Sequence, residues 1–139
     1  MRVLLVEDDP DHAELVRRGL EAHEPPVELT VVGDGEAALE YLEALEPGSL
    51  PHLVLLDLRL PRMGGLELLR VVRSRPVLGE LPCVILTTSD AERDVLAAHE
   101  LRADSYLVKP GDRGSFARLV REVEQRWLDV GRSRRRPDA

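Results

Sequence analysis

Side chains that could do chemistry follow four apolar, strand-like runs of this sequence. They are Glu7 and Asp8 after residues 3–6, Asp57 after residues 53–56, Thr87 after residues 84–86, and Lys109 after residues 106–108. Parallel strands bring their carboxyl ends to one edge of a sheet, where α/β proteins place their ligand crevices. Several acids, a hydroxyl and one lysine at such an edge suit a divalent cation and a phosphoryl group. We therefore predict a site at this edge, with Asp57 at its centre.

The elements that must position these side chains alternate regularly along the chain. We expect strands near residues 2–7, 27–32, 52–57, 82–87 and 104–108, and helices near residues 10–24, 35–46, 64–75, 90–101 and 112–129. Strands separated by helices of this length form right-handed crossover units and a parallel sheet. Acidic or hydroxyl side chains stand before several helices, so we expect Asp9, Asp112 and either Ser89 or Asp90 to cap them.

Composition limits the class of protein. The 139 residues include 43% hydrophobic and 32% charged residues and a net charge of −7, which is typical of a single soluble domain. The apolar runs are too short to span a bilayer, and the first residues do not resemble a secretory signal. Cys83 is the only cysteine, so no internal disulfide can form, and we expect a cytoplasmic protein without membrane contact.

The charge is unevenly spread. Four arginines lie within residues 132–139, and the rest of the chain is strongly acidic. An acidic body argues against direct nucleic-acid binding. We therefore interpret residues 130–139 as a basic, disordered tail. The four histidines (His12, His23, His52 and His99) show no metal-ligand spacing, and we expect them at the surface or its boundary.

Four motifs resemble those of a response-regulator receiver domain, in that family's order and spacing. They are Val-Glu-Asp-Asp-Pro at 6–10, Leu-Leu-Asp-Leu-Arg-Leu-Pro-Arg-Met at 55–63, Thr-Thr-Ser at 87–89, and Ser-Tyr-Leu-Val-Lys-Pro at 105–110. The resemblance runs from residue 2 to about residue 128. Residues 34–42 and 86–90 also resemble single-domain regulators that partner phytochrome-type and other hybrid sensor kinases.

The resemblance implies a phosphoryl-transfer site. Asp57 would accept a phosphoryl group from the phosphohistidine of a sensor histidine kinase, and the chain would catalyse only its own phosphorylation and dephosphorylation. Mg²⁺ would be held by Asp57, Asp8, Glu7 through water, and the backbone carbonyl of Arg59. The phosphoryl oxygens would meet Lys109, the Thr87 hydroxyl and the Thr88 amide, and Tyr106 would be the switch aromatic. The Lys109–Pro110 bond would be cis.

The fold implied is a doubly wound, flavodoxin-like α/β domain over residues 1–129. It has a five-stranded parallel sheet of order 2-1-3-4-5 and five helices. Output would pass through the helix at 90–101, the strand at 104–108 and the helix at 112–129, either to a homodimer or as one step of a phosphorelay. Trp127, Leu128 and Val130 offer an apolar patch for the dimer. In the alternative arrangement, Trp127 folds back onto the core.

Two other functions compete with this interpretation. A haloacid-dehalogenase-type phosphohydrolase also uses a strand-end aspartate with Mg²⁺, but it needs a second aspartate where this chain has Arg59. A receiver-like scaffold that works without phosphorylation is the other alternative, and the complete set of site residues argues against it.

Like charges at Glu7, Asp8 and Asp57 should disfavour their joint ionisation without metal. Two departures from the family pattern, Gly64 and Arg102, predict an uncapped third helix and a strained turn.

Overall fold

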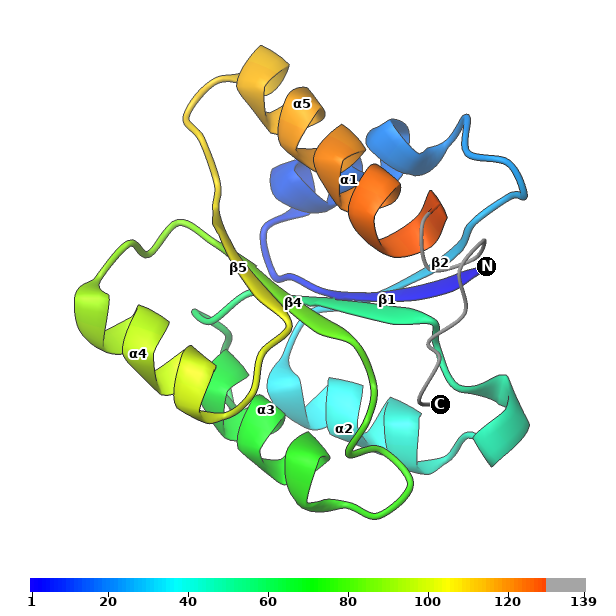
Figure 1. Ribbon diagram of the computed structural model, residues 1–139, viewed down its shortest axis with the longest axis vertical. Helices are drawn as coiled ribbons and strands as arrows, with labels where there is room; N and C mark the ends of the chain where they lie inside the picture. The colour runs from blue at the N-terminus through cyan, green and yellow to red at the C-terminus, as the bar shows by residue number, and fades with distance from the viewer. Residues whose placement is uncertain (130–139) are drawn as a thin grey trace.

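The protein folds around one parallel β-sheet, which the computed structural model describes together with its helices over residues 1–129 (Figure 1). The strands lie in the order β2-β1-β3-β4-β5. Their bounds are Arg2–Val6 for β1, Glu28–Val32 for β2, Leu53–Leu56 for β3, Cys83–Thr87 for β4 and Ser105–Val108 for β5. All four pairings between neighbouring strands are parallel. The predicted doubly wound fold and strand order are therefore confirmed.

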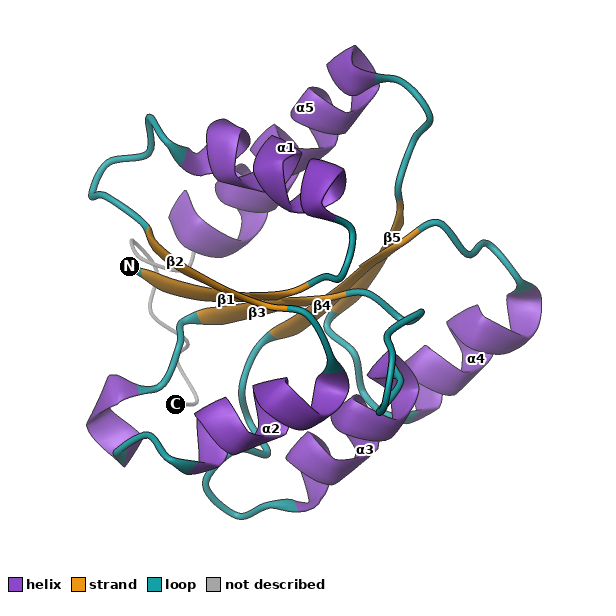
Figure 2. Cartoon of the chain, turned by 180° about the vertical axis from the view of Figure 1, so that it is seen from behind, coloured by secondary structure: helices purple, strands orange, loops and turns teal. Residues whose placement is uncertain are grey.

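Five α-helices cover the two faces of the sheet. They are α1 at Pro10–Leu20, α2 at Gly35–Glu43, α3 at Gly65–Ser74, α4 at Glu92–Glu100 and α5 at Arg113–Val123. A short 3₁₀ helix at Pro47–Ser49 precedes β3, and a π-helical segment at Glu124–Asp129 continues α5. Figure 2 shows α1 and α5 on one face and α2, α3 and α4 on the other. No helix formed by residues 1–129 combines the length and apolar character needed to cross a membrane.

The sheet separates the hydrophobic core into two clusters, because successive strand residues point to opposite faces. In β1, Leu4 and Val6 belong to the cluster under α2 and α3, whereas Val3 and Leu5 belong to the cluster under α1 and α5. The same alternation continues in β3 and β4. Strands buried on both faces read as continuous apolar runs, which is why β1, β3 and β4 were recognisable in the sequence.

The helix starts follow the predicted caps in two of three cases. The Asp9 side chain accepts hydrogen bonds from the first amides of α1, and Asp112 accepts one from Ser115 at the start of α5. The expected cap of the fourth helix is wrong. Its N-cap is Ala91, because the hydroxyl of Ser89 donates instead to Asp94 at 2.6 Å.

The first helix is shorter than expected and ends at Leu20 instead of residue 24. Its C-cap amide, at Glu21, turns back to the Arg18 carbonyl, and the chain then descends to β2 through His23. His23 is only 5% exposed, so its expected place at the surface is wrong. Its Nε2 lies 2.6 Å from a carboxylate oxygen of Asp129, which fixes the end of the π-helical segment to this loop.

Both departures from the family pattern have the predicted local effect. Gly64 is the N-cap of α3 and offers no side-chain hydrogen bond, and Arg102 adopts a left-handed backbone with φ of 64°. Arg62 also has a positive φ, of 65°, which the sequence did not reveal. An L-residue with a side chain is strained in this region, so both turns are held by their surroundings.

The apolar patch expected at the end of α5 is wrong. Leu128 is fully buried at 0% exposure, and Trp127 packs against the cluster under α1 and α5. The π-helical segment widens the last turns of the helix and so brings these side chains back toward the core. The alternative, in which Trp127 folds back, is the one observed. Val130 lies outside the described residues.

Candidate functional site

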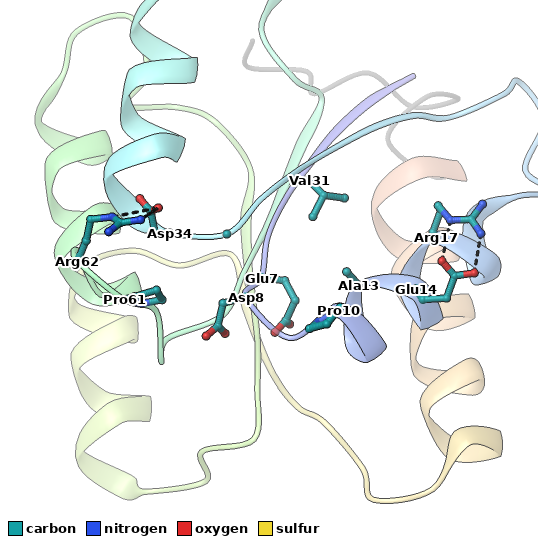
Figure 3. A pocket seen from close by; sticks show the side chains of 11 residues that line it. Glu7, Asp8, Pro10, Ala13, Glu14, Arg17, Val31, Asp34, Pro61 and Arg62 are labelled. Carbon is teal, nitrogen blue, oxygen red and sulfur yellow. Dashed lines mark hydrogen bonds and ion pairs between the residues drawn. The ribbon is translucent and has the colours of Figure 1, made fainter.

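The carboxyl ends of β1 and β3 bring three carboxylates together. One oxygen from each of Glu7, Asp8 and Asp57 lies within 4.8 Å of the other two. Glu7 and Asp57 are buried, at 3% and 7% exposure, whereas Asp8 is exposed. Figure 3 shows Glu7 and Asp8 side by side in an opening between the start of α1 and Pro61. Clustered carboxylate oxygens, some buried and one open to solvent, fit a hard divalent cation that keeps part of its water shell.

Lys109 occupies the floor of this site, where its side chain is 1% exposed. It follows β5, and its amide donates to the Thr87 carbonyl at 2.7 Å, which extends the β4–β5 pairing by one residue. Its ammonium group donates to Glu7 Oε1 and, at 3.1 Å, to Asp57 Oδ2. The single positive charge of Lys109 is therefore shared between the two buried carboxyl groups.

The two buried carboxylates respond differently to this network. Burial raises the pKa of Glu7 to about 7, and hydrogen bonding and charge from Lys109 only partly oppose the rise. Burial also raises the pKa of Asp57, but here the charge of Lys109 and a hydrogen bond from Thr87 outweigh it, and the pKa is lowered. The expected repulsion between the carboxylates is a minor cause of the raised pKa of Glu7, to which the charge of Asp57 adds less than burial does, and at Asp57 the pKa is lowered instead. Asp57 stays a carboxylate, which is the nucleophilic form.

A second network connects the site to α4. The buried Thr87 ends β4, and the Ser89 amide lies 3.4 Å from its hydroxyl. Ser89 donates its hydroxyl to Asp94, and its carbonyl accepts the Tyr106 hydroxyl at 2.8 Å. Arg59, two residues after Asp57, also approaches Asp94, at 3.5 Å. The sequence analysis missed the role of Asp94 in this network, because in the sequence Asp94 looks like an ordinary acidic residue in the first turn of a helix.

The structure brings most of the predicted site residues together, but one expected feature of the backbone is wrong. Glu7, Asp8, Asp57, Thr87 and Lys109 meet at one edge of the sheet, while Thr88 lies exposed beside them. The expected cis bond before Pro110 is wrong. Within residues 1–129 the cis bond is Glu24–Pro25, and Lys109 reaches the carboxylates from a strand-like backbone that ends in a trans peptide. His12, on α1, contacts Lys109 and was also missed.

Comparison with known proteins decides the family. A family model described as the response regulator receiver domain matches residues 3–121. The chain belongs to that family. Like other receiver domains, it is a response-regulator component of two-component signalling, and its family is one whose members bind divalent metal and are phosphorylated.

The relatives of this receiver domain include regulators of similar length. It is 41% identical to the probable methanogenesis regulatory protein FilR2 of Methanothrix harundinacea (strain 6Ac), over 94% of this chain and 86% of that protein. The manganese-bound form of the response regulator Rcp1 superposes with a TM-score of 0.87 at 36% identity, covering 93% of this chain and 95% of that one. The phosphorylated cyanobacterial phytochrome response regulator RcpA superposes with a TM-score of 0.89 at 32% identity, covering 93% of this chain and 94% of that one.

Proposed function

We propose that Asp57 accepts a phosphoryl group from the phosphohistidine of a sensor histidine kinase. The observation that carries this proposal is the ion pair between Lys109 and Asp57, 3.1 Å apart, at the end of a buried strand. An oxygen of Asp57 attacks phosphorus, the bond from phosphorus to the histidine nitrogen breaks, and an acyl phosphate forms. The lowered pKa of Asp57 supports this role, since it keeps the attacking oxygen unprotonated.

The surrounding side chains stabilise charge on the phosphoryl oxygens. Lys109 contributes a point charge, Thr87 a hydroxyl, and Thr88 a backbone amide. Glu7, Asp8, Asp57 and the Arg59 carbonyl would hold Mg²⁺, with Glu7 acting through water. Bound Mg²⁺ supplies further electrostatic stabilisation of the transferred group. The three-carboxylate cluster supports this assignment, and the manganese-bound form of Rcp1 is a related protein with a divalent metal.

The connection from Thr87 to α4 supports a switch. We assign that role to Thr87 and Tyr106, with Thr87 drawn to the phosphoryl group and Tyr106 moving inward. In the structure the Tyr106 hydroxyl is held on the Ser89 carbonyl, and Ser89 is in turn held by Asp94 of α4. Movement of Thr87 would disturb the neighbouring Ser89 and therefore change the surface formed by α4 and β5.

We propose that this surface, together with α5, forms a homodimer. Val95 and Leu96 of α4 and Val108 of β5 are 37%, 55% and 43% exposed, so each leaves apolar area open to a partner. These residues replace the end of α5 as the apolar part of the interface. Exposed apolar side chains gathered on neighbouring elements are typical of protein–protein contacts. In Figure 1, α4 lies beside β5 on the outer side of the molecule.

The remaining assignments follow from the same mechanism. The kinase is of the phytochrome type, which the likeness to the phytochrome response regulator RcpA supports. In the second candidate role, the protein passes the phosphoryl group on as an intermediate of a phosphorelay. The protein catalyses only its own phosphorylation and dephosphorylation. It acts in the cytoplasm. It does not bind nucleic acid directly, because the chain before its basic tail is strongly acidic. The receiver domain comprises residues 1–129, followed by a basic tail at 130–139.

Phosphorylation by a small donor tests the proposal. Wild-type protein incubated with acetyl phosphate and Mg²⁺ should gain one phosphoryl group by intact-mass spectrometry, and Asp57→Asn should gain none. Asp90→Asn is the matched control, because Asp90 is an exposed acid just beyond β4 and should leave labelling unchanged. Labelling of Asp57→Asn at another carboxylate would overturn the assignment. Absence of labelling in wild type would favour a scaffold that works without phosphorylation.

A further inference from the structure

His12, on α1, lies beside α5 and the buried Lys109 that follows β5. Its Nδ1 is 3.0 Å from the Lys109 ammonium nitrogen, and its side chain is 28% exposed. The imidazole ring faces Phe116 of α5, with ring centroids 5.6 Å apart and planes tilted by 32°. The backbone of His12 is fixed as well, because its amide lies 3.4 Å from the capping carboxylate of Asp9. The ring is therefore held in place from two sides.

The number of hydrogen bonds that Lys109 can donate determines which ring nitrogen of His12 carries the proton. An ammonium group can donate three hydrogen bonds and can accept none. Lys109 has three partners, namely Glu7 Oε1, Asp57 Oδ2 and His12 Nδ1. Since Lys109 can only donate, Nδ1 must offer its lone pair, and the imidazole is neutral with its proton on Nε2.

We propose that His12 is a positioning residue for Lys109. It accepts the third hydrogen of the ammonium group and so keeps that group directed at Asp57 when the phosphoryl group arrives. This inference rests on the proposed role of Asp57 as phosphoryl acceptor. A lysine has a flexible four-carbon stem, and its ammonium group could take several positions among competing carboxylates. A neutral acceptor fixed on α1 restricts those positions without adding charge to the site.

The contact has a built-in competitor. Asp9 Oδ2 lies 3.5 Å from the same Nδ1. The groups that face the ring are therefore Asp9 from the start of α1, Lys109 from the end of β5, and the apolar Phe116 from α5. A proton on Nδ1 would be donated to Asp9 and would remove the acceptor from Lys109. His12 can thus hold Lys109 only in its neutral form.

Two substitutions separate the acceptor from the shape of the ring. His12→Asn places an amide oxygen near the position of Nδ1, whereas His12→Phe keeps a ring against Phe116 and removes the acceptor. With acetyl phosphate and Mg²⁺ at about pH 8, we expect His12→Phe to be labelled about threefold to tenfold more slowly than wild type, the range for one lost hydrogen bond. His12→Asn should recover the rate to within about twofold. Melting temperatures of both variants verify that they fold.

Rescue by the conservative variant distinguishes positioning from a general loss of structure. If both variants fold and His12→Asn is labelled as slowly as His12→Phe, the role of the acceptor nitrogen is overturned.

A spectroscopic measurement tests the contact without metal or phosphoryl donor. Nitrogen-15 shifts of His12 in wild type at about pH 8 should show an unprotonated Nδ1 and a protonated Nε2. A proton on Nδ1 would overturn the inference. Equal labelling rates of wild type and His12→Phe would also overturn it, while leaving the acceptor role of Asp57 intact. Wild type that takes up no phosphoryl group would instead overturn the proposed function on which the inference rests.

Discussion

Lys109 and Glu7 are 102 residues apart in the chain, yet they form an ion pair in which each side chain is only 1% exposed. Burial of two charges is costly unless they are paired and hydrogen-bonded. Lys109 also forms an ion pair with Asp57. Its positive charge therefore reduces the repulsion between the carboxylates, which a divalent cation would otherwise have to reduce.

The stability of the metal-free protein should fall as pH rises from about 4.5 to about 7. Burial raises the pKa of Glu7 from 4.5 to about 7, so the folded state keeps a proton that the unfolded state loses in this window. The contribution of this group to the free energy of unfolding is fully present below pH 4.5 and lost above pH 7. Thermal unfolding without metal, as a function of pH, measures it.

Glu7→Gln should remove this slope, and Glu36→Gln, an exposed acid on α2, should leave it unchanged. Mg²⁺ should act in the opposite sense, because a ligand must be deprotonated to coordinate. The rise in melting temperature on adding Mg²⁺ should thus be larger near pH 8 than near pH 5. An equal effect of Mg²⁺ at both values would contradict the place of Glu7 in the metal site.

Gly65→Ala should destabilise the protein and slow its phosphorylation. A Cβ atom at Gly65 would lie 2.2 Å from the Asp57 carbonyl oxygen, which must then shift together with the acceptor residue. Overpacking of this kind costs about 1–3 kcal/mol. At the neighbouring Gly64 a Cβ would make an ordinary contact, at 3.5 Å from the Leu58 carbonyl, so Gly64→Ala is the control. Denaturant unfolding and labelling rates of the two variants should differ clearly.

Arg73→Met should lower the free energy of unfolding by about 2–4 kcal/mol. The Arg73 side chain is 8% exposed and donates to the carbonyls of Gly79, Leu81 and Arg102 and to the Asp104 carboxylate. These bonds hold the left-handed turn at Arg102, and their loss leaves the partly buried carbonyls of Gly79 and Leu81 without this donor. Arg70 is exposed on the same helix, and Arg70→Met should change stability by less than about 0.5 kcal/mol. Equal losses in chemical denaturation would contradict this role.

Leu96→Arg should abolish dimerisation of the phosphorylated protein. Leu96 is 55% exposed on α4, and a charge there would have to be buried in the proposed interface. Val77→Arg is the matched control, because Val77 is 56% exposed but lies in the segment between α3 and β4. Sedimentation velocity over a concentration series measures the effect. A wild type that stays monomeric with and without a phosphoryl group would refute the dimer.

The sequence was sufficient for the fold because strand and helix periodicities are local. The apolar runs at residues 3–6 and 53–56 could be read directly as buried strands, and the acids that follow them had to share one sheet edge. The α1 cap at Asp9 was visible for the same reason, since its partners are two and three residues away.

What the sequence could not show are contacts between distant elements. The ring of His12 meets Lys109 only because α1 crosses the end of β5, and 97 residues separate the two. Leu128 looked exposed because a regular α-helix would carry it past the core, whereas the π-helical segment changes its direction. In both cases the deciding geometry depends on how two elements pack, and neither a spacing nor a composition reports it.

The division of the core by the sheet has a practical consequence for protein engineering. Residues at alternate positions of β1, β3 and β4 face different clusters, so a combinatorial library confined to Leu4, Val54 and Ile85 remodels one cluster while leaving Val3, Leu53 and Val84 untouched on the other face. Recombining such half-libraries should preserve the site, since its residues lie at the strand ends or just beyond them.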